Sequence, residues 1–298
     1  MADEPFALAD RVAACLLSLT PSAVHRANRR LTQSHNFLTY EDDLRTLLEF
    51  HQDVVSPISS TFAYALPSSK ALRAIVKHAP SSIIEIGAGG GLWASLLRRC
   101  GVQVDAIDVS PPRLTYCNVR QCSDAWLPQT FRKAKAGAAL FLCWPPLELE
   151  LGEYGEVLAD SNTMASDALN VFKGDLLIYI GEWRGRTGLI SQLSDRTADC
   201  GQTAGENFQE WVERDWYVVE TVELPRWPGF ADSLVIFRSK YPKGASSPSS
   251  SAEPAPAVQP ALASTASSLS ERLRSMADVG LTQPGAIAAA ILLDQSVR

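Results

Sequence analysis

Histidine and cysteine are scarce in this sequence, which leaves little material for metal or disulfide chemistry. Six cysteines are spread over 298 residues without a C-x-x-C pair, too sparsely for a disulfide scaffold. All four histidines lie in the first 78 residues, apart from most of the cysteines. We therefore expect free thiols in a reducing compartment and no metal site. A hydrolase triad is also disfavoured, because its base would normally be a histidine and no G-x-S-x-G motif occurs.

Long apolar runs and an excess of basic residues are also missing. The longest wholly apolar stretch, residues 286–293, is eight residues long, whereas a membrane span needs roughly 20. Asp3, Glu4 and Asp10 stand where a secretory signal peptide would need positive charge. We therefore expect a cytoplasmic protein without a membrane partner. The 27 Lys and Arg against 33 Asp and Glu, a net charge of -6, argue against nucleic acid as a partner.

Composition divides the chain into four regions. Residues 1–66 show helical spacing without strand-like alternation, and residues 67–241 alternate short β-rich runs with helical stretches, as βαβ units do. Residues 242–268 are dominated by Ser, Pro and Ala, which predicts a disordered linker. Residues 269–298 are expected to form a short helical tail.

The central region predicts an open, mostly parallel sheet that ends in an antiparallel hairpin. The last two strands are separated by only eight residues, which is too short for a helical crossover. A helix is expected at 92–100. The strands are expected at residues 82–87, 102–108, 138–144, 175–182, 216–224 and 233–240.

A glycine-rich loop between the first strand and the helix is the most informative motif. It reads Glu85-Ile-Gly87-Ala-Gly89-Gly-Gly91, and the second strand ends at Asp108, 21 residues after Gly87. Glycines permit a tight turn and close approach of a ligand, and the acid can accept hydrogen bonds from ribose hydroxyls. The dinucleotide fingerprint G-x-G-x-x-G fails, because Leu92 occupies the place of its third glycine.

The string instead resembles motif I, E/D-x-G-x-G-x-G, of the class I S-adenosylmethionine-dependent methyltransferases. The resemblance implies a Rossmann-like α/β fold with a seven-stranded sheet, an N-terminal helical extension, and S-adenosyl-L-methionine as cofactor. It implies that Gly87, Gly89 and Gly91 line the methionine and ribose part of the cofactor and that Asp108 binds the ribose. Glu85 would orient the loop or contact the amino group.

A longer resemblance covers residues 62–241. The runs F-A-Y-A-L-P, E-I-G-A-G-G-G-L-W, L-F-L-C-W-P-P and Y-I-G-E are similar to a family of methyltransferase-like proteins that carry Y-A-x-P, E-I-G-A-G-x-G-x-W, W-P-P and Y-x-G-E. The combination is specific for the family but names no substrate. It implies that Tyr64 and Pro67 belong to an N-terminal lid that covers the cofactor, with packing of helices on the sheet as the alternative.

Three tryptophans follow predicted strands or the glycine loop. They are expected at the edge of the sheet formed by the carboxyl ends of the parallel strands, the carboxyl edge, where open α/β sheets bind ligands. Trp93, Trp144 and Trp183 could line a substrate pocket together with Pro145, or could pack between sheet and helices. The Trp-Pro-Pro run stands where amino-methyltransferases carry D/N-P-P-Y/F/W, but lacks the leading Asp or Asn. That departure, with the acidic charge, disfavours methylation of nucleic acid bases.

Glu182, after the predicted strand at 175–182, is the candidate general base or substrate anchor. A structural pairing with Arg184 or Arg186 is the alternative. The sequence thus predicts an enzyme, an S-adenosylmethionine-dependent methyltransferase acting on a small molecule or a protein side chain. A degenerate binding or scaffold protein, or a nicotinamide-dependent oxidoreductase, remains the alternative.

Overall fold

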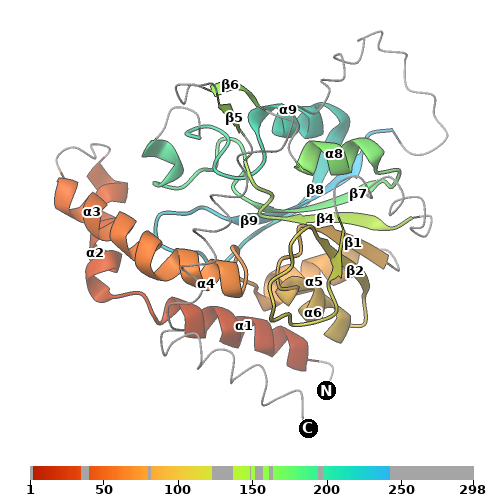
Figure 1. Cartoon of the computed structure of the whole chain (residues 1–298), viewed down its shortest axis with the longest axis horizontal. Helices are drawn as coiled ribbons and strands as arrows, with labels where there is room; N and C mark the ends of the chain where they lie inside the picture. Colours follow the sequence, from red (N-terminus) through yellow and green to blue (C-terminus); the bar gives the residue numbers. More distant parts are fainter. Residues whose placement is uncertain are drawn as a thin grey trace. The chain divides into compact units, whose positions relative to one another are not determined.

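The structure is a computed structural model of the whole chain (Figure 1). It describes residues 3–34, 40–79, 82–122, 137–147, 149–151, 157–160, 164–193 and 197–241, all of which lie in one compact unit. The predicted linker at 242–268 and tail at 269–298 lie outside the described residues.

The N-terminal region is helical, as predicted. Pro5 occupies the first turn of α1, where its missing N–H is not needed, and the first turn of α3 is acidic. A short π-helix, η2, connects α3 to α4. The elements are α1 (Glu4–Leu17), α2 (Ser22–Ser34), α3 (Glu41–Phe50), η2 (His51–Val55) and α4 (Ser56–Thr61).

No single helix among the described residues is both long and apolar enough to cross a membrane. Helices α1 and α2 pass that test of length and composition only when they are taken together, as a pair bent by 91°.

A seven-stranded sheet forms the centre of the unit, in the order β3-β2-β1-β4-β7-β9-β8. Neighbours from β3 to β7 run parallel, whereas β9 runs antiparallel to both β7 and β8. The strands are β1 (Ser82–Ile86), β2 (Gln103–Asp108), β3 (Arg120–Gln121), β4 (Ala139–Cys143), β7 (Leu176–Gly181), β8 (Trp216–Glu223) and β9 (Ser233–Ser239).

This topology confirms the predicted fold class, the Rossmann-like sheet of class I methyltransferases with an antiparallel end hairpin. Two features were not predicted. Strand β3 is only two residues long, and a separate hairpin joins β5 (Leu149–Leu151) to β6 (Val157–Asp160). Elements this short carry too few residues for periodicity to show.

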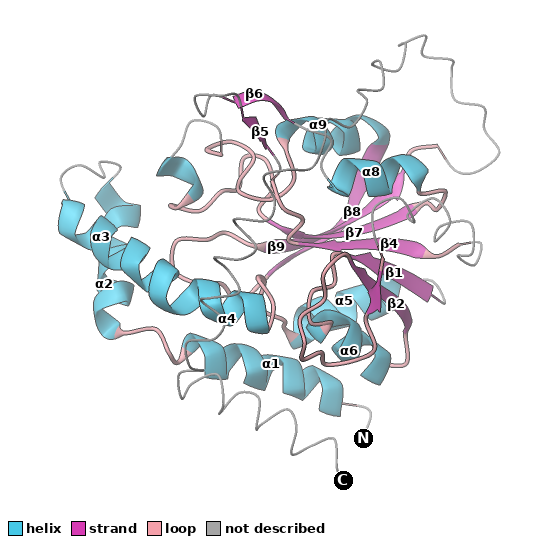
Figure 2. Cartoon of the chain, viewed as in Figure 1, coloured by secondary structure: helices cyan, strands magenta, loops and turns pink. Residues whose placement is uncertain are grey.

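Helices cover both faces of the sheet (Figure 2). On one face lie α5 (Ser69–His78) and α6 (Leu92–Arg99), with α1 packed against both. On the other lie α8 (Met164–Val171) and α9 (Glu206–Asp215). The central strand β7 is therefore buried along its whole length, which explains its uninterrupted apolar sequence.

Candidate active site

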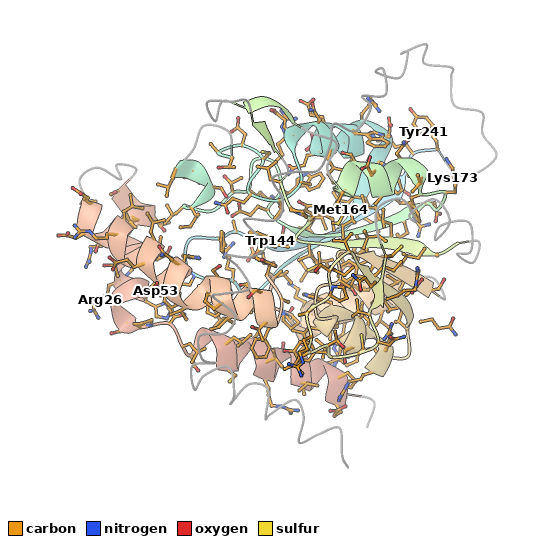
Figure 3. The ribbon with its side chains drawn as sticks, in the orientation of Figure 1. Arg26, Asp53, Trp144, Met164, Lys173 and Tyr241 are labelled. Atoms are coloured by element: carbon orange, nitrogen blue, oxygen red, sulfur yellow. The ribbon has the colours of Figure 1, made fainter. Side chains whose placement is uncertain are left out.

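A cavity of about 600 Å³ opens at the carboxyl ends of β1, β2 and β4. Its size is typical of sites that enclose a small organic ligand. The wall combines residues 59–60 and 62–64, from the end of α4 onward, with the glycine loop, the end of β2 and the segment after β4. Trp144 and Met164, both of which line it, lie near the middle of the molecule in Figure 3. The sheet and the N-terminal region thus build the cavity together.

The glycine loop has the geometry that the motif predicts. Gly87, Gly89 and Gly91 have φ angles of +73°, +53° and +75°, a region that side-chain-bearing residues rarely adopt. Residues 87–90 line the cavity. A Cβ added at Gly89 would meet no atom within 4 Å, so the loop leaves open space at this point.

Gly91 departs from the prediction that it lines the ligand. It is absent from the cavity wall and caps the N-terminus of α6 in the left-handed conformation. An added Cβ would lie 2.7 Å from Val119 Cγ2 and 2.8 Å from Cys117 Sγ. Packing against residues 116–119 therefore requires a glycine at position 91. This contact joins distant parts of the chain and cannot be predicted from the motif.

Substitution of these two glycines should therefore separate packing from cavity shape. Gly91→Ala and Gly89→Ala share the backbone strain of an L-residue at positive φ, but only the first also forces atoms apart. Overpacking typically costs about 1–3 kcal/mol, so Gly91→Ala should melt several degrees below Gly89→Ala in thermal unfolding followed by circular dichroism. Equal melting temperatures would contradict this assignment of Gly91.

Asp108 lies where the sequence places it, at the end of β2 and in the cavity wall. Its Oδ2 accepts a hydrogen bond from the Gly89 backbone at 2.7 Å, and its Oδ1 accepts one from the Ser110 backbone at 2.8 Å. The carboxylate therefore fixes the glycine loop as well as facing the cavity. Each carboxylate oxygen can accept a further hydrogen bond from a ligand.

Glu85 is the more deeply buried of the two acids in the cavity wall, with 1% of its surface exposed. No described residue donates a hydrogen bond to its Oε2. Burial raises the pKa of Glu85 to about 8, a rise that Arg98 opposes and Asp108 reinforces. A buried carboxyl oxygen without a donor is costly unless a ligand supplies one. Glu85 is thus poised to receive a donor or a cation.

Trp144 forms the aromatic side of the cavity. Its φ angle of +52° is unusual for a bulky residue, and such strain tends to persist at functional sites. The indole Nε1 donates to Asp232 Oδ1 at 2.8 Å. Tyr64 stacks on the indole with ring centroids 5.0 Å apart and planes 15° apart, and is 48% exposed. Tyr64 therefore stands at the mouth of the cavity, in contact with a strained tryptophan.

Asp232 is a residue that sequence reasoning missed. It lies in the loop between β8 and β9, 88 positions after Trp144, and is 1% exposed. Burial raises the pKa of Asp232 to about 7, although the hydrogen bond from Trp144 opposes the rise. A single acidic residue in a hairpin loop gives no sign in the sequence of its role, because the order of the strands in the sheet decides which residue it contacts.

Trp93 and Pro145 mainly pack inside the protein, whereas the sequence predicted that they line a substrate pocket. Trp93 touches the cavity but is 2% exposed, donates from Nε1 to the Ala65 carbonyl at 3.2 Å and packs edge-on against Phe141. Pro145 is buried away from the cavity, and Pro146 lines it instead. The turn after Trp144 therefore directs Pro146, and not the predicted Pro145, toward the cavity.

Trp183 does not lie in the cavity, contrary to the prediction of a substrate pocket. It packs in the core between Tyr179 and Phe237, with ring centroids 4.9 and 4.8 Å away. Its Nε1 donates to Glu213 of α9 at 3.3 Å. The alternative of packing between sheet and helix therefore describes this residue.

Glu182 also lies outside the cavity, so the structure does not support its prediction as general base. It is fully buried, and its Oε1 accepts backbone hydrogen bonds from Gly188 at 2.8 Å and Ala231 at 3.0 Å. Its Oε2 accepts from the Ser191 hydroxyl and, at 3.4 Å, from the Gln202 backbone. The pairing with an arginine is wrong too, since Arg184 binds Glu206 and Glu210, and no ion pair joins Glu182 to Arg186 among the described residues.

The charge of the cavity wall has one sign. Among the described residues that line it there is no Lys, Arg or His, and the acids are Glu85 and Asp108. Nor do the described residues contain a group of three or more His, Cys, Asp or Glu placed to hold a metal ion. A cationic group beside Glu85 would favour the ionised form of its carboxyl group, so the wall suits a ligand that carries positive charge there.

Three solved structures illustrate what this chain is similar to. One is the 1,6-didemethyltoxoflavin-N1-methyltransferase of Burkholderia thailandensis, at 13% identity and a TM-score of 0.35, over 57% of this chain and 76% of that one. Another is the N-methyltransferase NodS of Bradyrhizobium japonicum, at 13% and 0.34, over 63% and 98%. The mitomycin 7-O-methyltransferase MmcR gives 13% and 0.36, over 80% and 73%.

No protein-family model matches the sequence, and no curated protein matches it. Likenesses at these identities and TM-scores say nothing about what this chain binds. The class of its fold follows from its own strand order.

Proposed function

We propose that this protein binds S-adenosyl-L-methionine and transfers its methyl group to a small molecule or a protein side chain. One observation carries the proposal: a glycine loop held by Asp108 opens onto a cavity in whose described wall the acidic residues are Glu85 and Asp108, without a basic one. S-adenosylmethionine presents an ammonium and a sulfonium group, and two ribose hydroxyls, to such a wall.

The described residues fit this cofactor at two points. The partnerless Oε2 of Glu85 can accept from the ammonium group, and Asp108 can accept from a ribose hydroxyl. Bound S-adenosylmethionine supplies an electrophilic methyl group, so the protein mainly has to position the acceptor and exclude water. Tyr64 and Trp144 would form the flat wall against which an acceptor is placed.

A nicotinamide dinucleotide fits the same cavity less well. Its pyrophosphate would have to approach the N-terminus of α6, which reaches the cavity through Leu92 and Trp93, and no described wall residue is a Lys, Arg or His that could add a cation. Leu92, in place of the third fingerprint glycine, is 2% exposed at the start of α6. The wall therefore favours the cationic ligand.

Isothermal titration of the full chain with S-adenosylmethionine, S-adenosylhomocysteine, NAD and NADP tests the proposal. We expect binding of the first two and none of the dinucleotides, and transfer of a labelled methyl group to a component of a metabolite or peptide mixture. Binding of a dinucleotide alone would overturn the proposal. Tight binding of S-adenosylmethionine without transfer to any component would instead support a binding or scaffold protein.

The affinity for S-adenosylhomocysteine should depend on pH through Glu85. Its pKa of about 8 leaves the carboxyl group mostly protonated at neutral pH, and a bound ammonium group would lower that pKa. Binding then releases a proton, so affinity should rise with pH below about pH 8, by at most about tenfold per pH unit, and stop rising above it.

Titrations in buffers of different ionisation enthalpy would measure that proton release. In Glu85→Gln the side chain cannot ionise, so affinity should be lower and its rise with pH largely abolished. A wild-type affinity that does not change with pH, or an unchanged slope in the variant, would remove Glu85 from the ammonium site.

A further inference from the structure

A second cavity, of about 760 Å³, lies between helix α2 and two loops. We call it the α2 cavity. It is lined by residues of α2, by the segment 187–192 after β7, and by 226–231 of the loop between β8 and β9. It shares no lining residue with the candidate active site. In Figure 1, α2 lies with α3 and α4 to one side of the sheet.

Two buried polar atoms of the wall of this cavity have no hydrogen-bond partner among the described residues. They are the indole Nε1 of Trp227, a residue that is 1% exposed, and Oδ1 of Asn28. An unpaired buried donor or acceptor costs about 1–3 kcal/mol. Trp227 supplies an N–H donor, and the amide of Asn28 can both donate and accept. The wall therefore has polar groups that its own fold does not satisfy.

The α2 cavity also differs in charge from the active-site cavity. Arg226 and His25 line it, and the lining includes no Asp or Glu. Arg226 is exposed, and its charge opposes the rise in the pKa of the buried Asp232, but no hydrogen bond or ion pair joins it to another described residue. Its other lining residues include Leu17, Leu31 and Phe230. A cationic side chain beside an apolar surface can bind a ligand that has both an anionic group and an apolar body.

Two buried carboxylates adjoin this wall and are already engaged. Glu182 accepts hydrogen bonds from the backbones of Gly188 and Ala231, which line the cavity, and so faces it only through those peptide groups. Asp232, next in the chain, accepts from Trp144 on the side of the active site. The Trp227 indole N–H is thus left for an external group, and the exposed Arg226, whose charge also acts on Asp232, can pair with an anion.

We propose that the α2 cavity is a second ligand site, which binds a small organic carboxylate by its apolar body and its anionic group. Arg226 pairs with the carboxylate, and the Trp227 indole N–H donates a hydrogen bond to one of its oxygens. This site is independent of the proposed methyltransferase activity, because its wall contains none of the residues assigned to the cofactor.

Phenylacetate, with its neutral analogue phenylacetamide as a matched probe, tests the proposal in solution. The measurement is the nitrogen-15 spectrum of the tryptophan indoles in the full chain, with the Trp227 signal assigned by its loss in Trp227→Phe. We expect phenylacetate to shift that signal, and phenylacetamide to bind at least about tenfold more weakly, as loss of a charged hydrogen bond implies.

Arg226→Ala should weaken phenylacetate binding by at least about tenfold. Arg29→Ala is the control, since Arg29 is exposed on α2 and does not line the cavity. Saturating S-adenosylhomocysteine should not displace the probe. Displacement by it, equal binding of the two probes, unchanged binding in Arg226→Ala, or no shift up to the solubility limit of phenylacetate would each overturn the proposal. These results leave the test of the proposed function unaffected.

Discussion

Asp108→Ala is expected to weaken binding of S-adenosylhomocysteine by about 1 to 3 kcal/mol, the usual worth of a hydrogen bond to a charged group. The loss has two physical sources. The carboxylate can no longer accept from the ribose hydroxyls, and the Gly89 backbone loses the acceptor that now holds it at 2.7 Å. Isothermal titration of the variant and the wild type measures the sum of the two.

Asp108→Asn helps to separate these two sources. Its amide oxygen can still accept from the Gly89 backbone, so the loop should keep its conformation, while the negative charge toward the ligand is lost. We expect an affinity between those of the wild type and the alanine variant.

A control for both variants lies on the same strand. Asp105, three residues earlier on β2, is exposed and pairs with Arg120 at 2.8 Å on the surface. Asp105→Ala should leave S-adenosylhomocysteine binding unchanged, since exposed ion pairs contribute little. If Asp108→Ala bound as tightly as Asp105→Ala, the assignment of the cofactor site would be wrong.

Glu182→Ala is expected to lower the free energy of unfolding by about 3–5 kcal/mol, because it leaves several buried donors without an acceptor. These are the backbone N–H groups of Gly188 and Ala231, the Ser191 hydroxyl and, more weakly, the Gln202 backbone. For a domain of this size the melting temperature should fall by about 6–20 °C.

Thermal unfolding followed by circular dichroism measures this fall. Glu210→Ala is the matched control, because Glu210 pairs with Arg184 on the surface, is 54% exposed, and should cost less than about 1 kcal/mol. A melting temperature of Glu182→Ala close to that of Glu210→Ala would contradict the structural role.

The conservative variant Glu182→Gln distinguishes a structural role from a catalytic one. It retains one acceptor oxygen but points an amide donor at existing donors, so stability should fall by less than in the alanine variant. Loss of turnover together with cofactor affinity would fit disruption of the loops that Glu182 joins. Loss of turnover at unchanged stability and affinity would restore Glu182 to the catalytic machinery.

Local sequence patterns were sufficient to predict the central elements. Alternation and apolar runs located β1, β2, β4, β7, β8 and β9 to within a residue or two, because strand periodicity and turn residues act over a few positions. The short connection between the last two strands required the antiparallel hairpin. The glycine loop and the acid at the end of β2 followed from the same local chemistry.

The carboxyl edge was predicted less well, since its side chains are assigned by contacts between distant segments. Glu182 and Trp183 follow β7 at that edge, yet both turn into the interior, where Ala231 and Glu213 bind them. Trp144 stays at the cavity because Asp232 holds its indole. Sequence position fixes which edge a residue occupies, and packing decides the direction of its side chain.

By itself, the sequence determined an α/β chain with a Rossmann-like sheet, a glycine loop with its acid, and an acidic composition. Only the tertiary structure decided that Glu85 is buried with a free oxygen, that Glu182 joins loops instead of facing a ligand, and that α2 closes a second cavity. The physical reason is range. Propensity and turn geometry act between neighbours, whereas burial, pKa and cavity walls depend on residues brought together from far along the chain.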